Sequence, residues 1–187
     1  LAEPGWCVVP DILNAAETAA LRSECLDANA NSAFHRAGVG RGPSEVRSEI
    51  RGDHVLWIDE AHADPVLQNV LAKLETLRLA VNQALFLGLF DVELHFAIYP
   101  PGAGYRRHLD RFRDDDRRTL TVILYLNENW TAADGGLLRF WPDERTAALE
   151  IEPAGGTLVT FLSDRFWHEV LPAQRQRLSL TGWFRHR

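Results

Sequence analysis

The second half of the chain is divided into short segments rich in β-branched and aromatic residues, and turn-forming residues separate them. The segments run over residues 92–98, 119–126, 136–141, 148–151, 157–162, 168–171 and 178–184. Several short strands with regular turn signals are typical of a β-sandwich or a jelly roll. We therefore predict a mainly β fold with supporting helices, whose core occupies residues 91–187.

The first ninety residues have a different residue pattern, which predicts the supporting helices. Asn14 and Glu17 stand three positions apart, the spacing of a capping box, which predicts a helix to about Leu26. A second helix is predicted from about Pro65 to Leu87, because apolar residues recur there on one helical face. These residues are Leu67, Val70, Leu71, Leu74, Leu77 and Val81.

Between the helices, residues 27–50 are polar and bear Gly38, Gly40 and Gly42, which predicts a long mobile loop or a loose hairpin. Short strands are predicted at residues 6–9 and 55–58. No linker separates the helical part from the β part, and 187 residues is the length of one domain. We expect a single domain over residues 1–187.

The composition argues against several classes of protein. Lys and Arg number 20 against 26 Asp and Glu, and this net charge of −6 disfavours a nucleic-acid partner. No apolar run approaches the roughly 18 residues of a membrane-spanning helix, and no secretory signal is visible. Two cysteines favour a reduced, cytoplasmic compartment. Methionine is absent even at position 1, which predicts that the chain has been trimmed at its start.

Three residues have the chemistry of a metal site. His108 and Asp110 are two apart on an extended segment, so their side chains point to the same side. His168 comes just before another strand, and a jelly roll can bring two remote strands together at one mouth of the barrel. Two histidines and one carboxylate form the facial triad of non-haem Fe(II) oxygenases. His95 is interpreted as a packed core histidine, not as a fourth ligand.

Arg177 and Tyr125 are candidates for binding an anion. A buried arginine in an apolar strand is unfavourable unless an anion meets it, and a carboxylate fits the guanidinium fork. 2-Oxoglutarate offers one carboxylate to a metal and a second to such an arginine. Arg177 could equally be a surface residue on an edge strand, and Tyr125 a core aromatic.

From Tyr99 to Phe184 the sequence resembles the 2-oxoglutarate- and Fe(II)-dependent prolyl hydroxylases of the hypoxia-inducible-factor type. Beyond the spacing of His108, Asp110, His168 and Arg177, short segments carry the likeness: Tyr99-Pro100, Gly104-Tyr105, Tyr125-Leu126-Asn127, Gly135-Gly136, Ser163-Asp164-Arg165, His168-Glu169-Val170 and, upstream, Ile50-Arg51-Gly52-Asp53. The sequence departs from the family at two places. The turn before His108 is one residue shorter, and the arginine-rich stretch 111–118 differs from the family's sequence after the aspartate.

The resemblance implies a double-stranded β-helix (jelly-roll, cupin-like) core and a full set of site residues. Iron is implied at His108, Asp110 and His168. 2-Oxoglutarate is implied at Arg177, Tyr125 and Tyr99, with O2 as the second co-substrate and ascorbate as a reductant. For the substrate we predict Asp53, Arg118 and Trp183, although core packing explains Trp183 equally well.

The function that follows is a bacterial dioxygenase that hydroxylates C4 of a prolyl residue in a protein substrate and releases succinate and CO2. The partner would carry its proline in a flexible loop. Within residues 1–90, the stretch 30–53 is expected to act as a substrate loop that folds over a bound peptide. Two alternatives stay open: the same chemistry on a free amino acid or small metabolite, and a non-catalytic cupin-like metal-binding module.

Overall fold

The computed structural model of the protein describes residues 1–38, 49–111, 117–143 and 145–187. Its helices and strands are β1 (Trp6–Val9), α1 (Ala15–Ala30), β2 (His35–Arg36), β3 (His54–Trp57), α2 (Pro65–Leu85), β4 (Leu89–Tyr99), β5 (Tyr105–His108), β6 (Arg118–Tyr125), β7 (Leu138–Phe140), β8 (Leu149–Ile151), β9 (Leu158–Leu162), β10 (His168–Val170) and β11 (Arg177–His186). Short 3-10 turns stand at Glu60–His62 and Ala132–Asp134.

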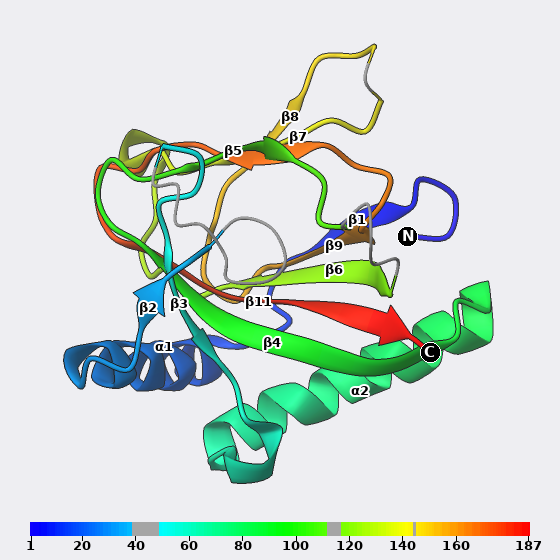
Figure 1. Ribbon diagram of the computed structural model, residues 1–187, viewed down its shortest axis with the longest axis horizontal. Coiled ribbons are helices and arrows are strands. Elements are labelled where there is room, and N and C mark those ends of the chain that lie inside the picture. The colour runs from blue at the N-terminus through cyan, green and yellow to red at the C-terminus, as the bar shows by residue number, and fades with distance from the viewer. Residues whose placement is uncertain (39–48, 112–116, 144) are drawn as a thin grey trace.

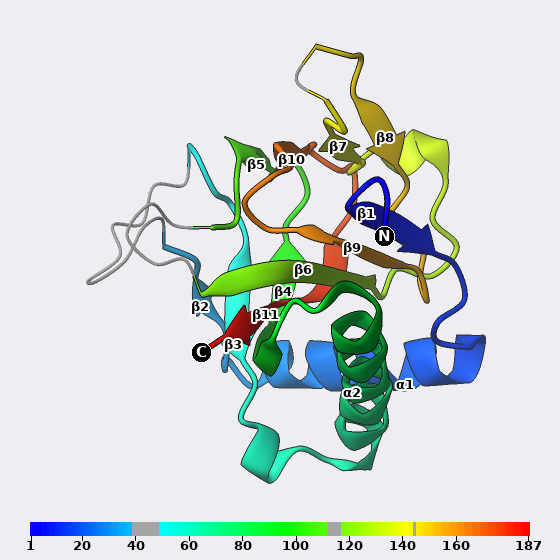
Figure 2. The same ribbon diagram turned by 90° about the vertical axis from the view of Figure 1, so that its right-hand side faces the viewer.

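The strands form two antiparallel sheets that face each other. The larger has the order β1-β9-β6-β11-β4-β3-β2 and the smaller the order β5-β10-β7-β8. Both helices lie against the outer face of the larger sheet, while the smaller sheet covers its inner face (Figures 1 and 2). The predicted mainly β fold with supporting helices is confirmed.

The capping box predicted for the first helix is present. Glu17 N donates to Asn14 Oδ1 and Asn14 N donates to Glu17 Oε2, both at 2.9 Å. The helix continues to Ala30, past the predicted end at Leu26. Local sequence therefore predicted where this helix begins better than where it ends.

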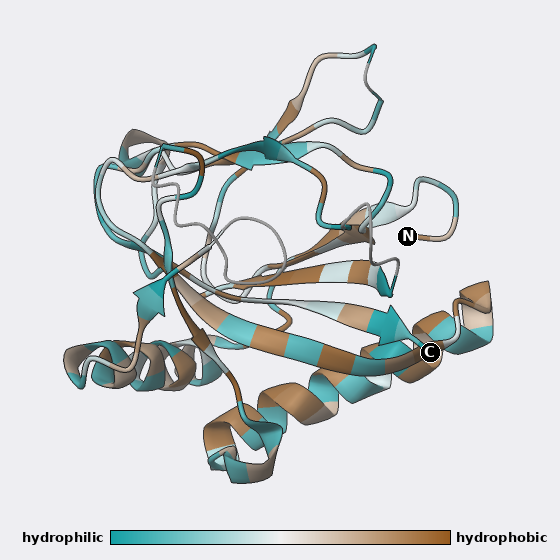
Figure 3. Cartoon of the chain, viewed as in Figure 1, coloured by the Kyte–Doolittle hydropathy of each residue, from teal (hydrophilic) through white to brown (hydrophobic). Residues whose placement is uncertain are grey.

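The second helix begins at its cap Asp64, whose carboxylate accepts from Leu67 N, and ends two residues before the predicted Leu87. Hydrophobic and hydrophilic residues are interspersed along it, as Figure 3 shows for α2. Four of the six predicted core positions, Leu67, Val70, Leu74 and Val81, are buried, and the other two are partly buried.

The stretch between the helices begins later than the predicted residue 27. It starts after Ala30, and His35–Arg36 pairs with His54–Val55 of β3, so the described part is a hairpin strand. Residues 39–48, the centre of the expected loop, and residues 112–116 of the charged run lie outside the described residues. The segment before His108, predicted only as extended, forms strand β5 and pairs with β10.

Two apolar clusters hold the layers together. One joins the helices to the larger sheet, and the other fills the space between the two sheets. Polar side chains are also buried on the inner face of the larger sheet, among them Arg177, Tyr125 and His95. No helix in the described ranges is long and apolar enough to cross a membrane.

Candidate active site

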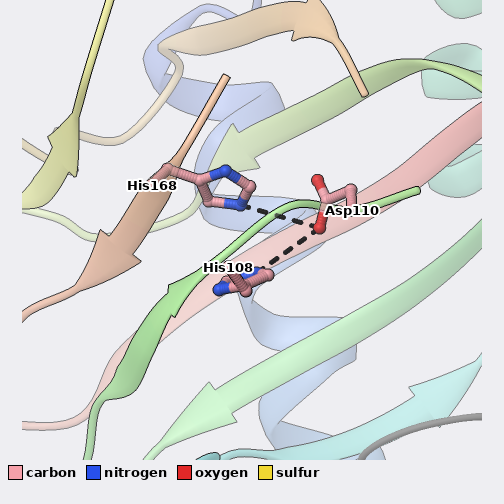
Figure 4. A group of neighbouring side chains, drawn as sticks. All are labelled: His108, Asp110 and His168. Atoms are coloured by element: carbon pink, nitrogen blue, oxygen red, sulfur yellow. Dashed lines mark ion pairs between the residues drawn. The ribbon is translucent and has the colours of Figure 1, made fainter. Parts of the chain in front are cut away.

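The pairing of β5 with β10 sets His168 directly opposite His108, and Asp110 follows two residues later. The three possible ligand atoms lie within 4.8 Å of one another. Nε2 of His108 is 3.5 Å from Asp110 Oδ1, and Nε2 of His168 is 3.6 Å from the same oxygen (Figure 4). The structure thus brings together residues that are 60 positions apart in the chain.

Hydrogen bonds behind the three residues hold their orientation. Nδ1 of His108 contacts the carbonyl of Arg106 at 2.7 Å, and Nδ1 of His168 contacts that of Phe166 at 3.0 Å. A carbonyl only accepts, so each Nδ1 is the donor, and in the neutral ring the lone pair stays on Nε2. This is the arrangement in which a histidine binds a metal through Nε2.

The carboxylate of Asp110 is held in the same way. Thr121 Oγ1 donates to Asp110 Oδ2 at 2.8 Å, so Ser163 Oγ, 2.9 Å away, must donate to Thr121. Oδ1 is left facing the two imidazoles. The period-two alternation of β6 puts Thr121 on the same face as Tyr125, but nothing in the sequence alone marked Thr121 as a partner of Asp110.

The charges of the three side chains suit a cation. Burial opposes ionisation of Asp110, but the imidazoles of His168 and His108 hold its pKa well below the usual range. Burial, together with His168, lowers the pKa of His108, whereas the carboxylate of Asp110 outweighs burial and raises the pKa of His168. An ionised carboxylate and two imidazole nitrogens fit Fe(II).

Arg177 lies further along the same sheet face and is fully buried. Its Nε donates to the carbonyl of Gly136 at 2.9 Å, and its guanidinium carbon is 5.3 Å and 5.0 Å from the ring centres of Tyr99 and Tyr125. Gly136 has φ +66°, and a Cβ there would come within 2.8 Å of Ala173, so only glycine allows this approach.

Two polar atoms at Arg177 and Tyr125 have no partner. Arg177 Nη2 and Tyr125 Oη are buried and make no hydrogen bond to the described residues. Buried donors in proteins are nearly always paired, so this pair fits a ligand carboxylate between the two side chains. Tyr99, predicted beside the co-substrate, is buried one strand away, opposite Arg177.

Comparison with known proteins agrees with this geometry. Residues 94–185 match the 2OG-Fe(II) oxygenase superfamily. The fold is similar to that of a Pseudomonas putida prolyl-4-hydroxylase, with 50% identity over 100% of this chain and 95% of the other and a TM-score of 0.90. The chain belongs to the 2OG-Fe(II) oxygenase superfamily.

Two further relatives of this oxygenase extend the likeness. A Trichoplax adhaerens prolyl hydroxylase, solved with a hypoxia-inducible-factor peptide fragment, is 28% identical over 98% of this chain and 84% of its own, with a TM-score of 0.90. Human Egl nine homolog 1 is 31% identical over 96% of this chain and 43% of its own length. The chain spans about half the length of the Egl nine homolog 1 relatives it matches.

The triad and Arg177 of this oxygenase line one cavity, and a groove of about 540 Å³ adjoins it. Arg51, Asp53, Tyr105 and Val170 line both. The predicted substrate residue Asp53 is buried, and both its oxygens accept from Arg51, at 2.8 and 2.9 Å. Arg51 in turn lies over Tyr105, whose ring stacks on His108 at 3.6 Å. The prediction missed Arg51, although its spacing from Asp53 on an extended segment was a signal for it.

The other two predicted substrate residues lie together at the other side of the cavity. Trp183 is buried and lines the cavity, so it is both a core residue and a wall. Arg118 places its guanidinium 3.5 Å from the ring centre of Trp183, and its Nε donates to Glu93 at 2.6 Å. Arg118 therefore supports the wall that Trp183 forms.

Proposed function

We propose that this oxygenase hydroxylates C4 of a prolyl residue in a protein substrate, with 2-oxoglutarate as co-substrate and succinate and CO2 as products. The observation that carries the proposal is Arg177, which lines the same cavity as the His108, Asp110 and His168 triad. Among the described residues, its Nη2 and the Oη of the neighbouring Tyr125 are buried without a hydrogen-bond partner. The likeness to two prolyl hydroxylases across nearly the whole chain supports the choice of substrate.

Each part of the site has a task in this reaction. His108, Asp110 and His168 would hold Fe(II), and a site with these three protein ligands suits a metal that also takes co-substrate and O2. Fe(II), when bound with 2-oxoglutarate and O2, supplies the oxidant that inserts an oxygen atom into a C–H bond while 2-oxoglutarate is decarboxylated. Arg177 and Tyr125 bind the carboxylate of 2-oxoglutarate distant from the metal and so fix its orientation.

The shape of the surface favours a peptide over a free amino acid. The adjoining groove continues from the cavity past Arg51 and the turn at Gly102–Gly104, and its volume of about 540 Å³ offers room beside the cavity for the neighbours of a prolyl residue. Arg51 and Asp53 stand where cavity and groove meet. We further propose one domain over residues 1–187, a cytoplasmic location, ascorbate as a reductant and a substrate proline in a flexible loop.

The test is to incubate a bacterial lysate with protein, Fe(II) and 2-oxoglutarate and to search by mass spectrometry for a gain of one oxygen atom on proline. We expect one or a few prolyl sites, and none with the His108→Ala, Asp110→Ala or His168→Ala variants. Each variant should also bind iron more weakly. Turnover of free proline or another metabolite, with no modified peptide, would replace the proposed substrate by the small-molecule alternative.

A further inference from the structure

His95 is a buried cavity residue to which the proposed reaction assigns no task. It lies on β4 between Trp57 of β3 and Thr181 of β11. Its ring stacks on that of Trp183, with centres 5.3 Å apart and planes at 26°, and tilts against that of Trp57 at 4.9 Å. It is packed, as predicted, but packing alone would be served by a side chain without nitrogen.

The polar atoms of this aromatic group lack partners. Within the described residues, His95 Nδ1 and Trp183 Nε1 are buried and make no hydrogen bond. Both residues line the cavity that holds the triad. Unpaired polar atoms gathered in a ligand cavity are explained by a ligand that pairs with them.

The polar atoms of His95 and Trp183 lie apart from those of Arg177 and Tyr125, which are assigned to the carboxylate. Trp183 and Arg177 are six positions apart on β11, about 20 Å along an extended strand. His95 is opposite Thr181, four positions from Arg177. One co-substrate molecule of the size of 2-oxoglutarate cannot pair with the polar atoms of both groups, so the His95 group is available to the substrate.

The charges around His95 make this group neutral. Burial, with repulsion from Arg51 and Arg118, lowers the pKa of His95 to about 3, so its ring is uncharged at physiological pH. Both of these cations are themselves paired with acids, Arg51 with Asp53 and Arg118 with Glu93. The indole N–H of Trp183 can only donate, and the neutral imidazole can donate through Nδ1 to a carbonyl oxygen.

We propose that His95 and Trp183 donate hydrogen bonds to the main-chain carbonyl of the residue being hydroxylated, and that His95 thereby makes the site specific for a residue inside a peptide. This inference rests on the proposed function. A main-chain carbonyl oxygen has two lone pairs and can accept from both neutral groups. A free amino acid would bring a carboxylate and an ammonium into a desolvated cavity wall where the two described cations near His95 are already paired with acids.

The experiment compares wild type with His95→Leu, which keeps the bulk without nitrogen, and His95→Asn, which keeps a polar atom near the position of Nδ1. Each protein is loaded with Zn²⁺ and 2-oxoglutarate, so that nothing turns over, and titrated by calorimetry. The probes are free proline and an alanine pentapeptide with blocked ends and a central proline. Thermal unfolding of the unliganded proteins is measured in parallel.

We expect His95→Leu to bind the pentapeptide at least about tenfold more weakly, which corresponds to about 1.4 kcal/mol. His95→Asn should stay close to wild type, and all three proteins should bind 2-oxoglutarate equally well. The unfolding temperature of His95→Leu should be unchanged or higher, because an unpaired buried polar atom has been removed. If His95 serves only packing, the unfolding temperature of His95→Leu should fall, and His95→Asn should not restore pentapeptide affinity.

The possible failures are distinguishable. Equal pentapeptide affinity of His95→Leu and wild type, with prolyl hydroxylation intact, would overturn the role of His95 and keep the proposed function. Tighter binding of a pentapeptide with a different central residue, again lost in His95→Leu, would overturn the prolyl substrate and keep the role of His95. A wild type that prefers free proline to the pentapeptide would overturn the inference, whatever the variants do.

Discussion

Replacing Arg177 by alanine should remove most of the affinity for 2-oxoglutarate and leave the metal site intact. The guanidinium is buried, its Nη2 has no partner in the part of the chain that the structure describes, and its Nε donates to the carbonyl of Gly136. Removing one partner of a buried charge pair costs about 2–5 kcal/mol. The dissociation constant for 2-oxoglutarate should therefore rise by roughly 30- to 5,000-fold.

Two conservative variants separate recognition from folding. Tyr125→Phe removes one hydroxyl and should weaken 2-oxoglutarate binding by about fivefold, the effect of about 1 kcal/mol for one hydrogen bond. Arg177→Lys keeps the charge but loses the planar fork and the Nε donor to Gly136, so it should bind 2-oxoglutarate with intermediate affinity.

The assay is calorimetric titration of 2-oxoglutarate into the Zn²⁺-loaded proteins, with Zn²⁺ affinity measured separately by chelator competition. Thermal unfolding confirms that each variant is folded. If Arg177→Ala and Tyr125→Phe both bind 2-oxoglutarate like wild type, the carboxylate site lies elsewhere in the cavity. If all variants lose zinc and 2-oxoglutarate together, Arg177 acts as a structural residue.

Three further outcomes are expected. Thr121→Val keeps the shape but removes the donor to Asp110, so chelator competition should show metal affinity falling about 10- to 100-fold. Gly136→Ala adds a Cβ 2.8 Å from a neighbouring side chain at φ +66°, so the unfolding temperature should fall and 2-oxoglutarate should bind more weakly. Burial and the nearby Asp64 raise the pKa of Glu24 from 4.5 to about 7. Across that window the native state keeps a proton that the unfolded chain releases, so denaturant titrations should show stability falling as pH rises, and Glu24→Gln should flatten the slope. A slope unchanged in Glu24→Gln would assign that pH dependence to other groups.

The sequence alone was sufficient for the elements whose determinants are local. The start of α1 depends on Asn14 and Glu17, three positions apart, and the strands follow from short apolar runs between turn residues. His108 and Asp110 were predicted to point the same way from the alternation of an extended chain, and their side chains do meet, although Asp110 lies in a bend just after β5. Residue chemistry then limited what such a pair, with His168, could bind.

Other features were beyond local patterns. The helix after Asn14 passed Leu26, because its end depends on where the chain leaves the sheet it packs on. Asp53 was predicted to meet substrate, but only the fold shows that Arg51 occupies both its oxygens. The sequence left open whether Trp183 packs in the core or lines the substrate site. In the structure it is buried and also lines the cavity.

The sequence by itself determined which residue types were present to hold a metal and an anion. The tertiary structure decided the register that sets His168 opposite His108, the burial of Arg177, and the hydrogen bond from Thr121 that orients Asp110. These depend on contacts between residues 11 to 60 positions apart, whose geometry is set by pairing of the strands and packing of the sheets. Alternation along one strand is a property of the backbone, whereas the partner across a sheet is chosen by the free energy of the whole fold.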